Sequence, residues 1–156
     1  MKNLLALLCV AEWFANDLHY KSTGIGFYEK HLLADRVRDF GSSEDDIKEK
    51  YFLGYKGELP PLDVDIAKTA TFAYNKIVQD KSTELERLEV VFGLILASVE
   101  ECKSEENLPS GVQSVLDKIS EDALTYKFLV RSESGMTNVS KTTTTVAPVD
   151  TAEVVA

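Results

Sequence analysis

Apolar residues recur every three or four positions along most of this chain, which predicts a largely helical protein. The second helix in chain order is expected over residues 27–40. After an interruption at Gly41-Ser42-Ser43, a further helical segment is expected over residues 44–55. The pattern leaves open whether these two form one kinked helix or two separate ones. The first helix is expected over residues 3–22, with an apolar stripe at Leu4, Leu8, Ala11, Ala15 and Leu18.

Three further helices are expected in the second half of the chain. The paired Pro60 and Pro61 exclude helix from the connection over 57–63, and a shorter helix follows around residues 66–77. Ser82 is expected to cap a long helix whose stripe is Leu85, Leu88, Phe92, Ile95, Val99 and Cys102. The last helix has the most regular spacing in the chain, at Val112, Leu116, Ile119, Ala123, Tyr126 and Val130.

These elements predict an all-α fold, a four-helix bundle over residues 1–132. The second and third long helices are joined by a long crossover, residues 57–81, that holds the extra short helix, so these two helices are expected to run parallel. That order, up-down-down-up, is the ferritin-like arrangement. Residues 133–156 are rich in Ser, Thr, Val and Ala without a period, and they are expected to form a disordered or extended tail.

Composition narrows the partners and the compartment. The chain has 156 residues, of which 44% are hydrophobic, enough for the core of one domain. Its net charge of −9, without a local basic patch, argues against direct nucleic-acid binding. No apolar run approaches the length of a membrane span, so no membrane partner is expected. The isolated Cys9 and Cys102 are expected to be buried free thiols, which favours a reducing, cytoplasmic location.

Candidate chemistry gathers in one stretch, from His19 to Glu49. The two histidines of the chain, His19 and His31, lie 12 residues apart, and Asp35 follows His31 by one helical turn. Asp45 and Glu49 repeat that four-residue spacing. Imidazole and carboxylate together are ligands of non-haem iron and similar divalent metals. The alternative is that the histidines are ordinary core or interface residues, and that the acids belong to a solvated helix face.

The same stretch resembles the first-helix signature of the Dps-like mini-ferritins, within the ferritin-like superfamily. The match consists of an L-H-aromatic triplet, a glycine, a phenylalanine, a second histidine and an aspartate, at Leu18-His19-Tyr20, Gly24, Phe27, His31 and Asp35. Residues 116–132 are similar to the last helix of the family, so the resemblance covers about residues 4–132.

The chain departs from the family at the second pair of acids. Asp45 and Glu49 match the family's acidic pair only if one residue is deleted after Asp35. Without that gap the pair falls on Asp46 and Lys50, and a protonated lysine cannot ligate iron. Gly41-Ser42-Ser43 also interrupts a helix that is continuous in the family, and the basic N-terminal arm that some members use on DNA is missing.

The resemblance implies a ferroxidase centre shared between two subunits of a homo-oligomer, a twelve-subunit hollow shell in this family. His19 would come from one subunit and His31, Asp35, Asp45 and Glu49 from its partner, or the reverse mixture. Peroxide or dioxygen would oxidise Fe(II), and ferric iron would be stored inside, protecting the cell from oxidative stress. The departures support an alternative function: a structural or interaction protein that keeps the bundle, has lost the iron site, and assembles through its bundle and C-terminal tail.

Overall fold

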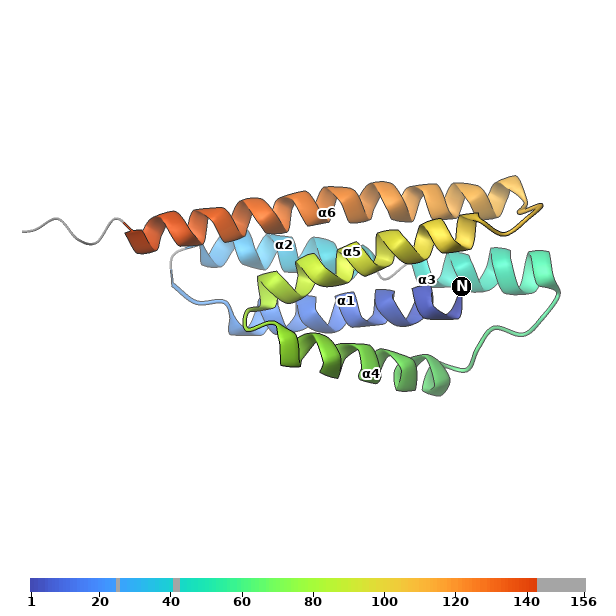
Figure 1. Cartoon of the computed structure of the whole chain (residues 1–156), viewed down its shortest axis with the longest axis horizontal. Coiled ribbons are helices and arrows are strands. Elements are labelled where there is room, and N and C mark those ends of the chain that lie inside the picture. Colours follow the sequence, from blue (N-terminus) through green and yellow to red (C-terminus); the bar gives the residue numbers. More distant parts are fainter. Residues whose placement is uncertain (25, 41–42, 143–156) are drawn as a thin grey trace, which may run out of the picture.

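The computed structural model of the protein describes residues 1–24, 26–40 and 43–142, with side chains as far as Gly135. Every regular element within these residues is helical, which confirms the all-α prediction (Figure 1). No helix in this part of the chain is long and apolar enough to cross a membrane.

The first two helices, α1 (Lys2–Lys21) and α2 (Phe27–Phe40), agree with the sequence prediction. All five residues of the predicted α1 stripe are buried. The turn between the helices contains Gly24 and Gly26, which both have positive φ angles (74° and 76°) that side chains with a Cβ rarely adopt. These glycines therefore let the chain reverse within a few residues and place the end of α1 beside the start of α2.

The helical segment that follows α2 has a form that the hydrophobic period did not predict. A short helix, α3 (Ser43–Ile47), continues directly into a π-helix, η1 (Lys48–Lys56). Tyr51 in η1 donates a hydrogen bond to Glu105 (2.9 Å), and Lys56 pairs with the same carboxylate. Two side chains of the π-helix are thus bonded to Glu105, in the turn between α5 and α6. Gly57, with φ 65°, ends it.

The crossover helix α4 (Asp63–Asp80) is longer than the sequence predicted and packs on the outside of the bundle against α1 and α5 (Figure 1). Its Tyr74 stacks on Phe14 of α1, with ring centroids 4.6 Å apart. The Tyr74 hydroxyl donates to Asp17, also on α1, at 2.8 Å. One side chain therefore supplies both apolar and polar contacts that hold the crossover in place.

Thr83, and not the predicted Ser82, caps α5 (Glu84–Lys103). The Thr83 hydroxyl accepts from the Glu86 amide, and the Glu86 carboxylate accepts from the Thr83 amide, a complete capping box. The prediction was wrong by one residue because this box needs the threonine three positions before the glutamate. Ser82 contributes a further hydrogen bond to the same carboxylate (3.0 Å).

The last helix, α6 (Ser110–Thr142), runs ten residues past the predicted domain boundary at 132. The expectation of a tail from residue 133 is therefore wrong as far as 142. The helix is longer than predicted because it meets no proline before Pro148, and because extending an existing helix needs no new nucleus. The rest of the predicted tail, 143–156, lies outside the described residues.

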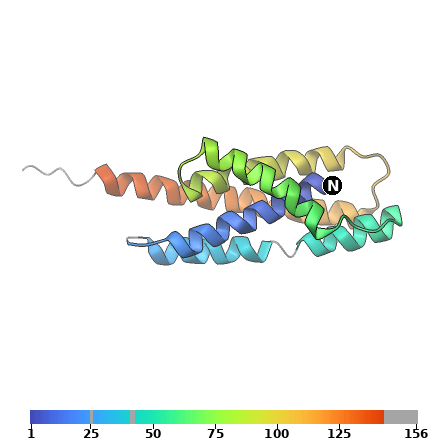
Figure 2. The same ribbon diagram turned by 90° about the horizontal axis from the view of Figure 1, so that it is seen from below.

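Four helical rods make the bundle: α1, α2 followed end to end by α3 and η1, α5, and α6 (Figures 1 and 2). Figure 1 shows α1 and α6 running in one direction and α2 and α5 in the other, so the two helices joined by the long crossover are parallel. The largest fully buried side chains come from all four rods and include Leu4, Leu8, Phe14, Ile47, Leu88, Phe92, Ile95, Leu116 and Ile119.

Candidate metal centre

The α1–α2 turn brings three of the five predicted ligands together in one chain. His19 lies in the last turn of α1, and His31 and Asp35 lie one helical turn apart on α2. The His19 and His31 rings stack with centroids 3.6 Å apart at an interplanar angle of 30°. His19 Nδ1 lies 3.1 Å from Asp35 Oδ1, and Arg38 approaches the same oxygen at 3.6 Å. His19 and His31 can therefore meet within one chain, and a shared site does not require them to come from different subunits.

Aromatic rings flank the histidine pair on both sides. Tyr20 meets His19 edge to face at 5.1 Å, and Phe27 tilts against His31 at 4.9 Å. Both aromatic residues are exposed, Tyr20 by 77%. The four rings form a short ladder that narrows the approach to the imidazoles while leaving its outer edges in water.

Both Nδ1 atoms are buried and make no hydrogen bond among the described residues. Asp35 approaches His19 to 3.1 Å, an ion-pair distance, without forming a hydrogen bond to its Nδ1. A buried polar atom without a partner costs about 1–3 kcal/mol. The histidine pair therefore contains two buried nitrogens whose hydrogen-bonding capacity is not used among the described residues.

The stacked arrangement does limit how an ion could bind. An imidazole nitrogen donates its lone pair in the plane of its own ring, and the two planes here are nearly parallel. One ion held by both histidines therefore requires one ring to turn about its Cβ–Cγ bond. In the orientation shown, no three His, Cys, Asp or Glu residues of the described chain converge on a common point.

The remaining two predicted ligands lie elsewhere. Asp45 on α3 and Glu49 on η1 are exposed. They belong to the α3–η1 part of the rod, whereas Asp35 belongs to α2. The alternative pair, Asp46 and Lys50, forms an i,i+4 ion pair of 3.3 Å. One chain alone thus brings together three of the five predicted ligands, His19, His31 and Asp35.

A cluster that sequence reasoning missed joins α1, α3, the first residue of η1 and the start of α4. Lys48 pairs with Glu44 (2.7 Å) and Asp63 (2.9 Å). Burial would lower the pKa of Lys48, but its hydrogen bonds to these two carboxylates raise that pKa to about 12. Burial, together with Glu44 and Glu12, raises the pKa of the Cys9 thiol to about 11. Cys9 therefore stays protonated at neutral pH and is a poor nucleophile or ligand.

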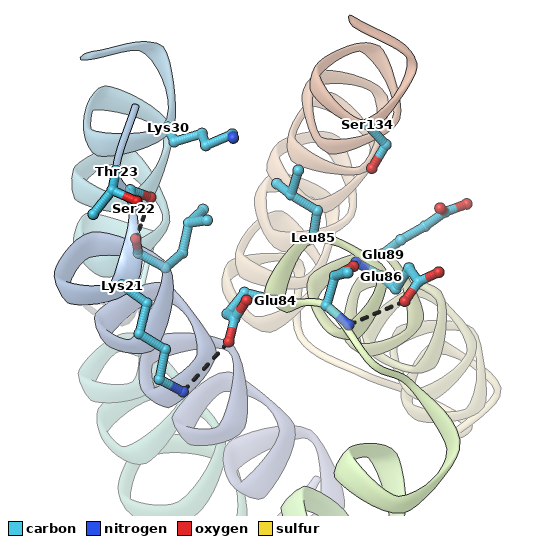
Figure 3. A pocket seen from close by; sticks show the side chains of 11 residues that line it. Lys21, Ser22, Thr23, Lys30, Glu84, Leu85, Glu86, Glu89 and Ser134 are labelled. Atoms are coloured by element: carbon cyan, nitrogen blue, oxygen red, sulfur yellow. Dashed lines mark hydrogen bonds and ion pairs between the residues drawn. The ribbon is translucent and has the colours of Figure 1, made fainter. Parts of the chain in front are cut away.

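A cleft of about 510 Å³ opens at the end of the bundle, between the α1–α2 turn and the start of α5 (Figure 3). Its charged groups largely neutralise one another: Lys21 pairs with Glu84 at 3.3 Å, and Glu86 is engaged in the α5 capping box. Lys30 extends into the cleft from α2 (Figure 3). Sequence patterning gave no sign of this cleft, because its walls come from three separate segments.

Comparisons with protein-family models, curated proteins and solved structures gave no significant match. The case for a function therefore depends on the residues and their geometry.

Proposed function

We propose that this protein is a Dps-like, iron-binding protein that oxidises Fe(II) at a site shared between two copies of the chain. The single observation that carries the proposal is the pair of stacked, half-buried imidazoles of His19 and His31, whose buried Nδ1 atoms have no hydrogen-bond partner in the described residues, with Asp35 3.1 Å from His19. Imidazole and carboxylate suit ferrous iron, and a ligand there would satisfy atoms that are otherwise costly to bury.

The exposed surface near His19, His31 and Asp35 supports the proposal that a second copy of the chain supplies the remaining ligands. On α2, Tyr28, Leu32 and Arg36 recur at intervals of four and are all exposed. On α3 and η1, the exposed residues with this spacing are Asp45, Glu49 and Leu53.

The two stripes are complementary when two copies of the rod lie antiparallel. Arg36 has no carboxylate partner in the described chain, and it would face Asp45 of a second copy. Tyr28 would face Leu53 in the same register. A two-fold axis between the rods makes both contacts twice. The same register brings Asp45 and Glu49 of one copy toward His31 and Asp35 of the other.

The helix order agrees with this proposal. In the ferritin-like topology, two antiparallel helix pairs are joined by one long crossover. Here the crossover contains α4, which packs outside the bundle (Figure 1). We infer from the resemblance that copies assemble further into a closed shell with an acidic interior. The net charge of −9 suits the attraction of ferrous ions.

The proposed chemistry treats iron as the substrate. Two Fe(II) ions each give one electron to a peroxide molecule, its O–O bond breaks, and two protons complete two waters while both ions become Fe(III). Dioxygen is the alternative oxidant. The role of the chain is to hold the ions by imidazole and carboxylate, leave coordination positions open for the oxidant, and keep bulk water away through the flanking rings of Tyr20 and Phe27.

One observation favours a second candidate function, that of a structural or interaction protein. Lys50 pairs with Asp46, one of the two positions to which the ungapped family spacing assigns ligands. An ammonium at that place would repel a ferrous ion. The alternative is therefore a structural or interaction protein that retains the bundle and assembles without iron chemistry.

The deciding experiment is Fe(II) oxidation by stoichiometric hydrogen peroxide, followed by absorbance. The wild type is expected to oxidise iron faster than buffer, and His31→Ala/Asp35→Ala to lose that excess. Asp80→Ala is the matched control, since Asp80 is an exposed carboxylate on α4 with no ion-pair partner in the described chain. Equal rates for the wild type and the double variant would exclude the site and favour the structural alternative.

Subunit mixing tests whether the site is shared. His31→Ala/Asp35→Ala and Asp45→Ala/Glu49→Ala are each expected to be inactive alone. A two-fold dimer containing one of each keeps one intact site and one doubly damaged site. Random mixing should therefore restore about a quarter of wild-type activity. If activity stays absent after mixing, the two ligand pairs do not meet across an interface.

A further inference from the structure

The connection before α4 is a rigid, extended segment with apolar side chains turned to solvent. Proline rings set φ near −65° at Pro60 and Pro61 and restrict the residue before each to extended conformations. Leu62 has φ −63° and ψ 143°, which are polyproline II angles. This helix has three residues per turn, so Leu59 and Leu62 lie on one edge. They are 87% and 67% exposed.

Both ends of the segment are fastened to the bundle. Gly57 takes a left-handed conformation at the end of η1, and the Glu58 amide donates to the Phe52 carbonyl (3.0 Å). At the other end, Lys48 holds Asp63 at 2.9 Å. A segment restrained at both ends loses little conformational entropy on binding, so its two exposed leucines are suited to a docking role.

The chain carries a matching surface at the opposite end of the bundle. Tyr20, Phe27 and Tyr28 form an exposed aromatic corner where α1 ends and α2 begins. Exposed aromatic rings are the surface on which proline-rich polyproline II segments are bound. In Figure 1 the corner and the η1–α4 connection lie at opposite ends of the molecule, so they cannot meet within one chain.

We propose that the Leu59–Leu62 segment of one copy docks on the aromatic corner of a second copy. The charges beside the two surfaces are opposite in sign: Glu58 adjoins the segment, and Lys30 follows Phe27 by three residues, about one helical turn, on α2. An antiparallel pair of copies makes this contact twice, once at each end. The inference rests on the assembly in the proposed function and extends it beyond the helical rods.

The contact also affects the histidine pair. Tyr20 and Phe27 are the outer rings of the ladder around His19 and His31. A partner segment lying over them closes the edges that are open to water in a single chain. The Leu59–Leu62 segment is therefore a lid supplied by the neighbouring copy, as well as an anchor.

The test is self-association of Leu59→Ser/Leu62→Ser, measured by sedimentation velocity over a range of concentrations. The dissociation constant is expected to rise at least tenfold. Leu94→Ser/Leu124→Ser is the matched control, because those leucines are also exposed but lie on α5 and α6. Circular dichroism and thermal unfolding check that each variant is folded. If both pairs associate as the wild type does, or if both weaken it equally, the inference is overturned.

A photo-crosslinker in place of Tyr20 gives an independent measurement. In mixed ¹⁴N and ¹⁵N protein, crosslinked peptides should join position 20 of one copy to the segment over 58–63 of another. Crosslinks that map elsewhere, or none between copies, overturn the docking. If iron oxidation survives in an assembled Leu59→Ser/Leu62→Ser variant, only this inference fails. If His31→Ala/Asp35→Ala oxidises iron normally while the leucine variant dissociates, the iron function fails and the docking stands.

Discussion

Replacing His31 by phenylalanine is expected to stabilise the metal-free protein, although it removes a proposed ligand. The buried Nδ1 of His31 has no hydrogen-bond partner, and such an atom costs about 1–3 kcal/mol. Because the His31 side chain is only half-buried, we expect the lower end, about 1 kcal/mol. A phenyl ring preserves the stacking between His19 and Phe27. For a chain of this size the gain corresponds to a rise in Tm of about 3 °C.

The assay is urea unfolding of chelator-treated protein at a fixed pH for all variants. Zn²⁺, a redox-inert substitute for Fe(II), is then added. At 100 times its dissociation constant it should stabilise the wild type by about 2.7 kcal/mol, and it should not stabilise His31→Phe, because phenylalanine has no ligand atom. Tyr20→Phe is the control, with an expected change within about 0.5 kcal/mol.

Two results would refute this reasoning. If metal-free His31→Phe unfolds more easily than the wild type by about 1 kcal/mol or more, the imidazole makes a favourable native contact and is not an unsatisfied group. If Zn²⁺ stabilises the variant as much as the wild type, the ion binds elsewhere. Either outcome removes the observation on which the iron proposal depends.

Three further predictions concern the bundle itself. Leu116→Ala, at a fully buried core position, should lower the free energy of unfolding by about 2–5 kcal/mol in denaturant titration, whereas the exposed Leu124→Ala should change it by less than about 0.5 kcal/mol. Thr83→Ala breaks the capping box of α5 and should cost about 1 kcal/mol; an unchanged midpoint would mean that the box adds nothing. The hydrogen bond from Lys56 lowers the pKa of Glu105 below its usual 4.5, so this pair stabilises the fold above pH 4.5 and loses that effect as the pH falls through the lowered value. The stability gap between wild type and Lys56→Met should therefore narrow in acid, and a gap independent of pH would contradict the assignment.

Local pattern predicted the helices well where burial and helical period coincide. The α1 stripe is buried throughout, and α2 begins and ends where predicted. Errors arose where local signals compete. Thr83 and Ser82 are both good caps, and the spacing to Glu86 decides between them. The polar, aperiodic composition after residue 132 suggested a tail, but α6 continues to Thr142, with no proline in that stretch to end it.

The sequence by itself determined the helical class, the apolar faces and the residue types of a candidate metal centre, because these follow from periodicity and side-chain chemistry within one element. Only the tertiary structure decided which of those residues meet. It placed His19 against His31 and Asp35 through the α1–α2 turn, and it left Asp45 and Glu49 exposed further along the rod. Spacing along a chain sets which face of a helix a residue occupies, but contacts between elements depend on how the helices pack, and that is a property of the whole bundle.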